Sequence, residues 1–148
     1  MSLISEVFGL NNPPCDPVRH TYVELGLQRG DSFALALKKP FRKLIGIEVN
    51  AEHHRTCVAR FNGDGEFSCP CGCGFIQTRS FLFGSTIDVL PHILPSLGSQ
   101  DEPTTFWLDS HFTGDRQDEM DPRHGQCPLL EELKLICATP WKTKPILL

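Results

Sequence analysis

Acidic side chains stand at or near the ends of three predicted β-strands, where chemistry is commonly found in α/β proteins. Glu24 lies within TYVEL, Glu48 closes LIGIE, and Asp109 follows TTFWL with His111 two positions later. In open parallel sheets, ligands bind outside the carboxyl ends of the strands. We therefore take Asp109 and His111 as the candidate catalytic residues, Asp109 orienting a substrate hydroxyl or a metal and His111 accepting a proton. The simpler alternative is that Asp109 caps a loop and His111 is exposed.

A glycine-containing turn follows the first of these strands. Gly26 and Gly30 permit tight backbone without a Cβ, so a ligand can lie against the turn. Asp31 or Ser32 is predicted to cap a helix beginning at Phe33, and the free N–H groups of that helix start suit an anionic group.

The spacing within this turn restricts the ligand. A dinucleotide fingerprint started at Gly26 would need glycines where the chain has Gln28 and Asp31. A pyrophosphate is therefore poorly served and a nucleoside without phosphates fits better. Glu48 stands where an acidic side chain accepts hydrogen bonds from both ribose hydroxyls.

Two motifs in this region resemble those of class I S-adenosylmethionine-dependent methyltransferases. ELGLQRGDS at 24–32 is similar to motif I in its E/D-x-G-x-x-x-G-D-S form, which is common in O-methyltransferase-like families, and GIEVN at 46–50 is similar to motif II. Gln28 replaces the central glycine of the commoner GxGxG version. The resemblance extends over 21–148 and includes GSTIDVLP at 84–91, WLDSH at 107–111 and LLEEL at 129–133.

The resemblance implies a fold and a cofactor. The fold would be α/β, a three-layer Rossmann-like sheet, mainly parallel, with strand order 3-2-1-4-5 and helices on both faces. The family has seven strands, so we expect a domain truncated after the fifth. The cofactor would be S-adenosylmethionine and the reaction methyl transfer to an oxygen or nitrogen of a small-molecule acceptor.

The resemblance also assigns roles in cofactor binding. The backbone at 26–30 would hold the methionine part, Glu48 the ribose, and Val49 and Ser85 the adenine. Ser85 stands where the family often has an acidic residue. The implied cofactor-binding residues are Glu24, Gly26, Gln28, Gly30, Asp31, Ser32, Glu48, Val49, Ser85 and Asp109.

Strands and helices alternate along the chain in the way that such a site requires. Strands are predicted at 21–25, 44–48, 75–83 (as two short pieces around Thr78 and Arg79), 104–108 and 145–148. Helices are predicted at 33–39, 51–61 with Asn50 as N-cap, 87–97, and 128–137. Two apolar stripes are expected to face the core, one of Leu90, Ile93, Leu94 and Leu97, the other of Leu129, Leu130, Leu133, Ile136 and Cys137.

Length and composition predict one domain across 1–148. We expect 1–20 to be an N-terminal extension, 63–74 a Cys/Gly-rich insertion, and 112–127 a possible lid loop. The net charge of −4 does not suggest a nucleic-acid surface. We find no apolar run of transmembrane length and no signal-peptide pattern in 1–14, and we expect the seven cysteines to be reduced. These observations predict a cytoplasmic protein without a membrane partner. An apolar fifth strand at the sheet edge suggests a homodimer.

Three other functions compete with the methyltransferase. The first is a degenerate relative of the same fold that binds a nucleoside or a partner without catalysis. The second is a nicotinamide oxidoreductase, disfavoured by Gln28 and Asp31. The third is a zinc or redox module built on Cys69, Cys71 and Cys73, which departs from the usual paired CxxC signature of structural zinc.

Overall fold

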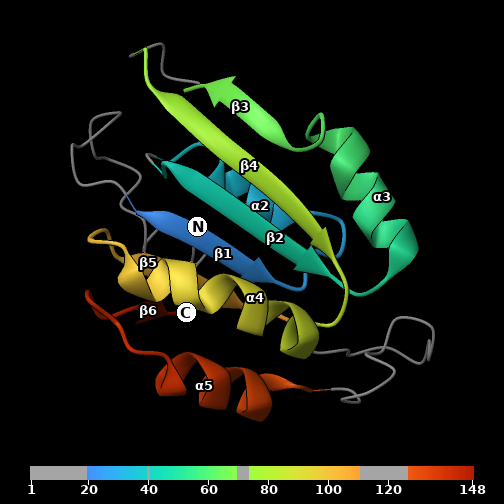
Figure 1. Ribbon diagram of the computed structural model, residues 1–148. Coiled ribbons are helices and arrows are strands. Elements are labelled where there is room, and N and C mark those ends of the chain that lie inside the picture. Colours follow the sequence, from blue (N-terminus) through green and yellow to red (C-terminus); the bar gives the residue numbers. More distant parts are fainter. Residues whose placement is uncertain (1–19, 40, 70–73, 111–126) are drawn as a thin grey trace.

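The computed structural model describes residues 20–39, 41–69, 74–110 and 127–148. In these residues six strands form one sheet, with helices on both of its faces (Figure 1). The strands are β1 (Thr21–Leu25), β2 (Lys43–Glu48), β3 (Gly65–Ser68), β4 (Ile76–Phe83), β5 (Thr104–Leu108) and β6 (Ile146–Leu147). The helices are α2 (Asp31–Ala36), α3 (Ala51–Arg60), α4 (Thr86–Ser99) and α5 (Leu129–Ala138). The fold class is therefore α/β with a mostly parallel sheet, as predicted.

The strand order is β3-β4-β2-β1-β5-β6, which differs from the predicted five-strand order 3-2-1-4-5. The difference comes from β3, which pairs antiparallel with β4 at the sheet edge, whereas the other pairs are parallel. This strand lies within 63–74, where an insertion was predicted from the glycine and cysteine content. The Arg79 guanidinium lies 4.0 Å from the centre of the Phe67 ring, a contact that holds the edge strand against β4.

β4 is also a single strand, although two short pieces were predicted. It pairs in parallel register with the whole length of β2, from Lys43 opposite Thr78 to Glu48 opposite Phe83. The continuous ladder with a buried neighbour outweighs the weak β-propensity of the polar residues in the middle of the strand.

The alternation of side chains along each strand divides the core into two layers. On β1, Tyr22 belongs to the cluster that α2 and α3 cover, while Val23 and Leu25 belong to the cluster that α4 and α5 cover. Successive residues of a strand point to opposite faces, so a strand buried on both faces is apolar almost throughout.

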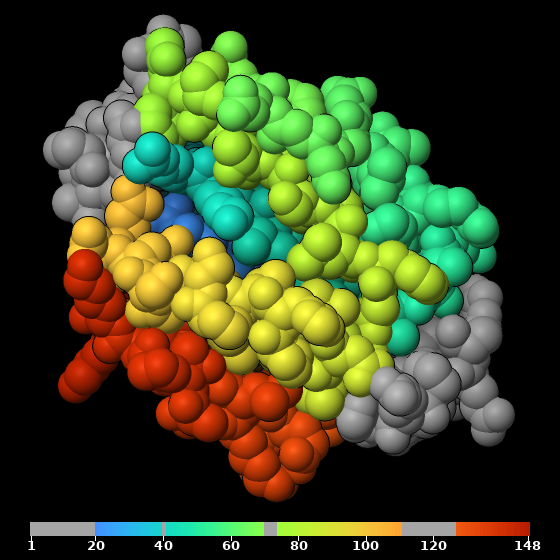
Figure 2. Space-filling view, in the orientation of Figure 1, coloured from blue at the N-terminus to red at the C-terminus, as the bar shows by residue number. Residues whose placement is uncertain are grey.

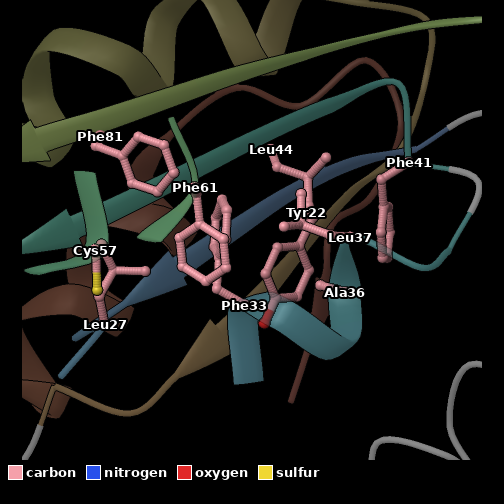
Figure 3. Close-up of a cluster of buried hydrophobic side chains, with 10 residues drawn as sticks. All are labelled: Tyr22, Leu27, Phe33, Ala36, Leu37, Phe41, Leu44, Cys57, Phe61 and Phe81. Carbon is pink, nitrogen blue, oxygen red and sulfur yellow. The ribbon is translucent and has the colours of Figure 1, made fainter. Parts of the chain in front are cut away.

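Aromatic rings dominate the layer under α2 and α3 (Figure 3). The centroid of the Phe33 ring lies 5.3 Å from that of Phe61 and 5.1 Å from that of Phe81, and Tyr22 lies 5.0 Å from Phe41. Such pairs each add roughly 0.5–1.5 kcal/mol beyond the burial of their area. The six residues of α2 are too few for a stable isolated helix, so Phe33 anchors α2 by packing.

The opposite layer lies under α4 and α5, which lie side by side (Figure 2). Leu90, Leu94 and Leu97 are buried as predicted, and Ile93 is half-buried. The stripe predicted for α5 is wrong in part, because Leu129, Leu130 and Cys137 are exposed and Leu133 is half-buried. The buried positions of α5 are Ile136 and, one turn earlier, the carboxylate residue Glu132.

Two features bear on partners. The side chains of Ile146 and Leu147 in β6 are 42% and 40% exposed, and the homodimer expected at this edge stays a prediction. Among the helices in the described ranges, none has the length and apolar character needed to cross a bilayer.

Candidate functional site

Three carboxylates meet where adjacent parallel strands end. Glu24 in β1 is in register with Gly46 of β2 and Trp107 of β5, so Glu48 and Asp109 each lie two residues further along the neighbouring strands, on the same face as Glu24. This is the face that α2 and α3 cover. The strands deliver these three side chains to one edge, as the sequence predicted from their positions.

Glu24 is buried among these charges. Its side chain is 1% exposed, and its Oε2 accepts a hydrogen bond of 2.7 Å from the Tyr22 hydroxyl. The pKa of Glu24 is raised to about 8, chiefly by burial. The charges of Asp109 and Glu48 also raise it, while the hydrogen bond from Tyr22 lowers it. Burial thus favours the protonated form of Glu24 at neutral pH.

Glu48 fastens the first turn to the end of β2. Its Oε2 accepts a hydrogen bond from the Gln28 backbone N–H at 2.7 Å, and its Oε1 accepts one from the Asn50 N–H at 2.8 Å. The carboxylate thus faces the turn between β1 and α2. Glu48 is 4% exposed, and each of its carboxylate oxygens has a second lone pair that can accept a further hydrogen bond.

The turn itself is built from three left-handed residues. Gly26, Gln28 and Gly30 have φ values of 88°, 49° and 82°. Glycine adopts this conformation without cost, but Gln28 does so with a Cβ, at a cost of about 1 kcal/mol or more. Gln28 therefore occupies a position whose backbone favours the glycine found in the commoner motif, and its backbone N–H bond to Glu48 helps to hold it there.

Both glycines have close neighbours in the protein. An ideal Cβ at Gly26 would lie 2.4 Å from the Asp109 carbonyl oxygen, so the exits of β1 and β5 can pack together only without a side chain here. A Cβ at Gly30 would lie 2.7 Å from the Phe61 ring and 3.1 Å from the Cys57 sulfur. The two glycines thus allow backbone to approach backbone at one end of the turn and α3 to approach at the other.

The start of α2 differs from the prediction. The helix begins at Asp31 and its N-cap is Gly30, with no side-chain capping hydrogen bond, whereas Asp31 or Ser32 was expected to cap a helix starting at Phe33. The Asp31 carboxylate instead accepts a hydrogen bond of 2.7 Å from Arg60 of α3. The left-handed backbone at Gly30 leads directly into the helix, and glycine has no side chain with which to cap the first turn.

The two predicted adenine contacts lie at the ends of β2 and β4. Val49 is half-buried between Glu48 and Asn50, and the Asn50 side chain caps α3 as predicted, accepting from the Glu52 and His53 N–H groups at 3.0 Å. Ser85 is buried and is the N-cap residue of α4. Its carbonyl accepts backbone hydrogen bonds from α4, including one of 3.0 Å from Val89.

Of the two predicted catalytic residues, the structure places one. Asp109 is half-buried, and its backbone N–H donates to the Leu25 carbonyl at 3.0 Å, which continues the β1–β5 ladder by one residue. His111 lies outside the described residues, as does all of the predicted lid loop at 112–127 except Cys127. The described structure therefore contains Asp109 but no geometry for the pair.

A buried polar cluster on the opposite face was missed by sequence reasoning. Glu132 of α5 is fully buried, and its Oε1 accepts hydrogen bonds from the hydroxyls of Thr86 and Ser110. A glutamate in the first turn of a helix ordinarily points to solvent, where it complements the helix dipole, and this made the position look exposed. The one available signal was its i, i+4 spacing to Ile136, which puts both on one helix face.

Other candidate chemistry lies elsewhere or outside the described residues. Cys69 is buried at the end of the β3 edge, while Cys71 and Cys73 fall outside the described ranges. Within those ranges, no group of three or more His, Cys, Asp or Glu side chains could hold a metal ion. One cavity of about 750 Å³ lies between α4 and α5, lined by Leu94, Leu135 and Trp141 among others, and one of about 550 Å³ lies near the amino ends of β1 and β2.

Comparison of the chain with models of protein families, with curated proteins and with solved structures found no match.

Proposed function

We propose that this chain is a methyltransferase domain with a Rossmann-like sheet, which binds S-adenosylmethionine and methylates an oxygen or nitrogen of a small molecule. The observation that carries the proposal is the Glu48 carboxylate, which closes β2 and is hydrogen-bonded to the left-handed turn after β1. An acid at this position beside a glycine turn suits a ligand with a ribose diol.

The strand order supports the proposed location of the ligand. From β1 the chain moves through α2 to β2 and through α3 to β4 on one side, and then through α4 to β5 on the other side of β1. The carboxyl ends of β1 and β5 therefore flank a switch point, where ligands of open α/β sheets bind. Glu24, Gly26 and Asp109 lie at this point.

Each group of the chain has a proposed task. Glu48 accepts hydrogen bonds from the ribose hydroxyls, the backbone of 26–30 contacts the methionine part, and Val49 and Ser85 contact the adenine. The negative charges of Glu48 and Asp109 complement a positively charged sulfonium.

The cofactor supplies an activated methyl group. The chain has to hold the acceptor in line with it and take up one proton, so catalysis consists chiefly of proximity and alignment. Asp109 accepts that proton or orients the acceptor hydroxyl, with His111 as the other proposed proton acceptor.

Calorimetric titration of the full chain with S-adenosylhomocysteine and S-adenosylmethionine tests the proposal. We expect both to bind, and we expect Glu48→Gln to weaken binding about tenfold or more, because hydrogen bonds to a charged acceptor contribute about 1.5–3 kcal/mol. Glu66→Gln is the matched control, since Glu66 is an exposed carboxylate on β3. Failure of the wild-type chain to bind either compound would refute the proposal.

The close packing of the turn favours a second candidate, a nucleoside-binding domain of the same fold without catalysis. Gly26 is in contact distance of the β5 exit and Gly30 of α3, so packing within the protein accounts for both glycines. This candidate predicts binding of S-adenosylhomocysteine or adenosine without methyl transfer to a panel of hydroxyl and amine acceptors. Methylation of any acceptor by the wild-type chain, lost in Asp109→Asn, would exclude it.

A further inference from the structure

The buried carboxylate of Glu132 joins three segments of the fold. It belongs to α5, and its Oε1 accepts hydrogen bonds from the Thr86 hydroxyl at the first residue of α4 and from the Ser110 hydroxyl in the segment after β5. Glu132 is 0% exposed and Thr86 is 4% exposed, so these bonds are formed away from water. Hydrogen bonds formed away from water are stronger than those at the surface.

The two hydroxyl residues are the chain neighbours of two proposed site residues. Ser110 follows Asp109, and because side chains alternate along an extended segment, Ser110 points to the α4 and α5 face while Asp109 points to the face of Glu24 and Glu48. Thr86 follows Ser85 at the start of α4. Glu132 thus holds, from the α4 and α5 face of the sheet, the two segments that carry Ser85 and Asp109.

A carboxylate is a costly choice at this position. The neighbouring buried residue on the same helix face is Ile136, and a leucine in place of Glu132 would add apolar packing without the cost of removing a carboxyl group from water. Burial of the carboxyl group therefore does not serve general stability best. Its specific effect is to fix two hydroxyls, and with them two loop segments, in one arrangement.

We propose that Glu132 is a positioning residue for the carboxyl edge of the sheet, which sets Ser85 and Asp109 relative to each other. The inference rests on the proposed function only for the identity of the ligand. Glu132 itself makes no contact with the ligand in this proposal.

The test compares three variants by local hydrogen exchange and by ligand affinity. Glu132→Leu removes the acceptor and keeps the volume, Glu132→Gln keeps an oxygen acceptor and the shape, and Ile136→Val changes the same buried helix face without touching the cluster. The reporter amides are those of Asp109, bonded to the Leu25 carbonyl, and Val89, bonded to the Ser85 carbonyl.

Exchange decides the role of Glu132. We expect Glu132→Leu to speed exchange at both reporter amides by about tenfold or more relative to the His54 amide in α3, which is bonded to the Asn50 carbonyl. Glu132→Gln and Ile136→Val should change that ratio by less than about threefold. Equal effects of Glu132→Leu and Ile136→Val would overturn the proposal.

Affinity tests the consequence for the ligand. Glu132→Leu should weaken S-adenosylhomocysteine binding by about tenfold, with Glu132→Gln within about threefold of wild type. If the wild type binds, unchanged affinity in Glu132→Leu would overturn the proposal. If the wild type binds nothing, the proposed function fails, and the exchange ratios still decide whether Glu132 orders the edge.

Single hydroxyl variants keep the test available if Glu132→Leu does not fold. Ser110→Ala should loosen the Asp109 amide and leave Val89 protected, whereas Thr86→Val should do the reverse. Loosening of neither amide would overturn the proposal as well.

Discussion

Replacing Glu24 by glutamine should change how the stability of the protein depends on pH. Burial raises the pKa of Glu24 to about 8 from an ordinary value of 4.5. Between these two values the folded chain keeps a proton on Glu24 that the unfolded chain has lost. The contribution of Glu24 to stability is therefore complete below pH 4.5 and is lost as the pH rises through 8.

The size of the effect follows from the shift. Each pH unit within this window should lower the free energy of unfolding by about 1.4 kcal/mol, and the whole window by roughly 5 kcal/mol. That is a large part of the roughly 5–15 kcal/mol that stabilises an ordinary domain. Glu24→Gln keeps the shape and an oxygen that can accept from Tyr22, but it cannot lose a proton, so the variant lacks this slope.

Urea unfolding at three pH values between about 5.5 and 7.5 measures the difference between the two proteins. The stability of Glu24→Gln relative to wild type should rise by about 1.4 kcal/mol per pH unit, because the effects of all groups that the two proteins share cancel in the difference. Glu66→Gln, which alters an exposed carboxylate, should show no such trend. A pH-independent difference between Glu24→Gln and wild type would refute the reasoning from burial.

Two further predictions concern left-handed residues, again measured by urea unfolding. Gly26→Ala should lower the free energy of unfolding by more than about 2 kcal/mol, because the new Cβ would lie 2.4 Å from a carbonyl oxygen. Gly63→Ala is the control: the nearest contact of its Cβ is 3.9 Å away, so it should lose only the cost of its φ of 74°. Equal losses in the two variants would contradict the packing role of Gly26. Gln28→Gly should leave the free energy of unfolding unchanged or raise it by up to about 1 kcal/mol. The variant releases the strain of the left-handed backbone, but its unfolded chain is more flexible, which offsets part of the gain. A clear loss of stability would show that the Gln28 side chain contributes contacts of its own.

Local signals in the sequence were sufficient for several features that depend on neighbours along the chain. The strand 104–108 and the Asn50 cap of α3 match the structure, because β-propensity and capping act within a few residues. The sequence also predicted that Glu24, Glu48 and Asp109 lie at one edge of the sheet. Parallel strands all end at the same edge, so the position of each residue at the end of its strand was enough.

Features that depend on partners distant in sequence were decided only by the tertiary structure. The raised pKa of Glu24 needs burial close to Asp109 and Glu48, and no local pattern contains that information. The strand β3 forms because β4 offers it a free edge. Glu132 is buried because two hydroxyls, 46 and 22 residues away in sequence, converge on it. Sequence periodicity gives the face of a helix on which a residue lies, but the groups that meet that face are brought there by the packing of the whole chain.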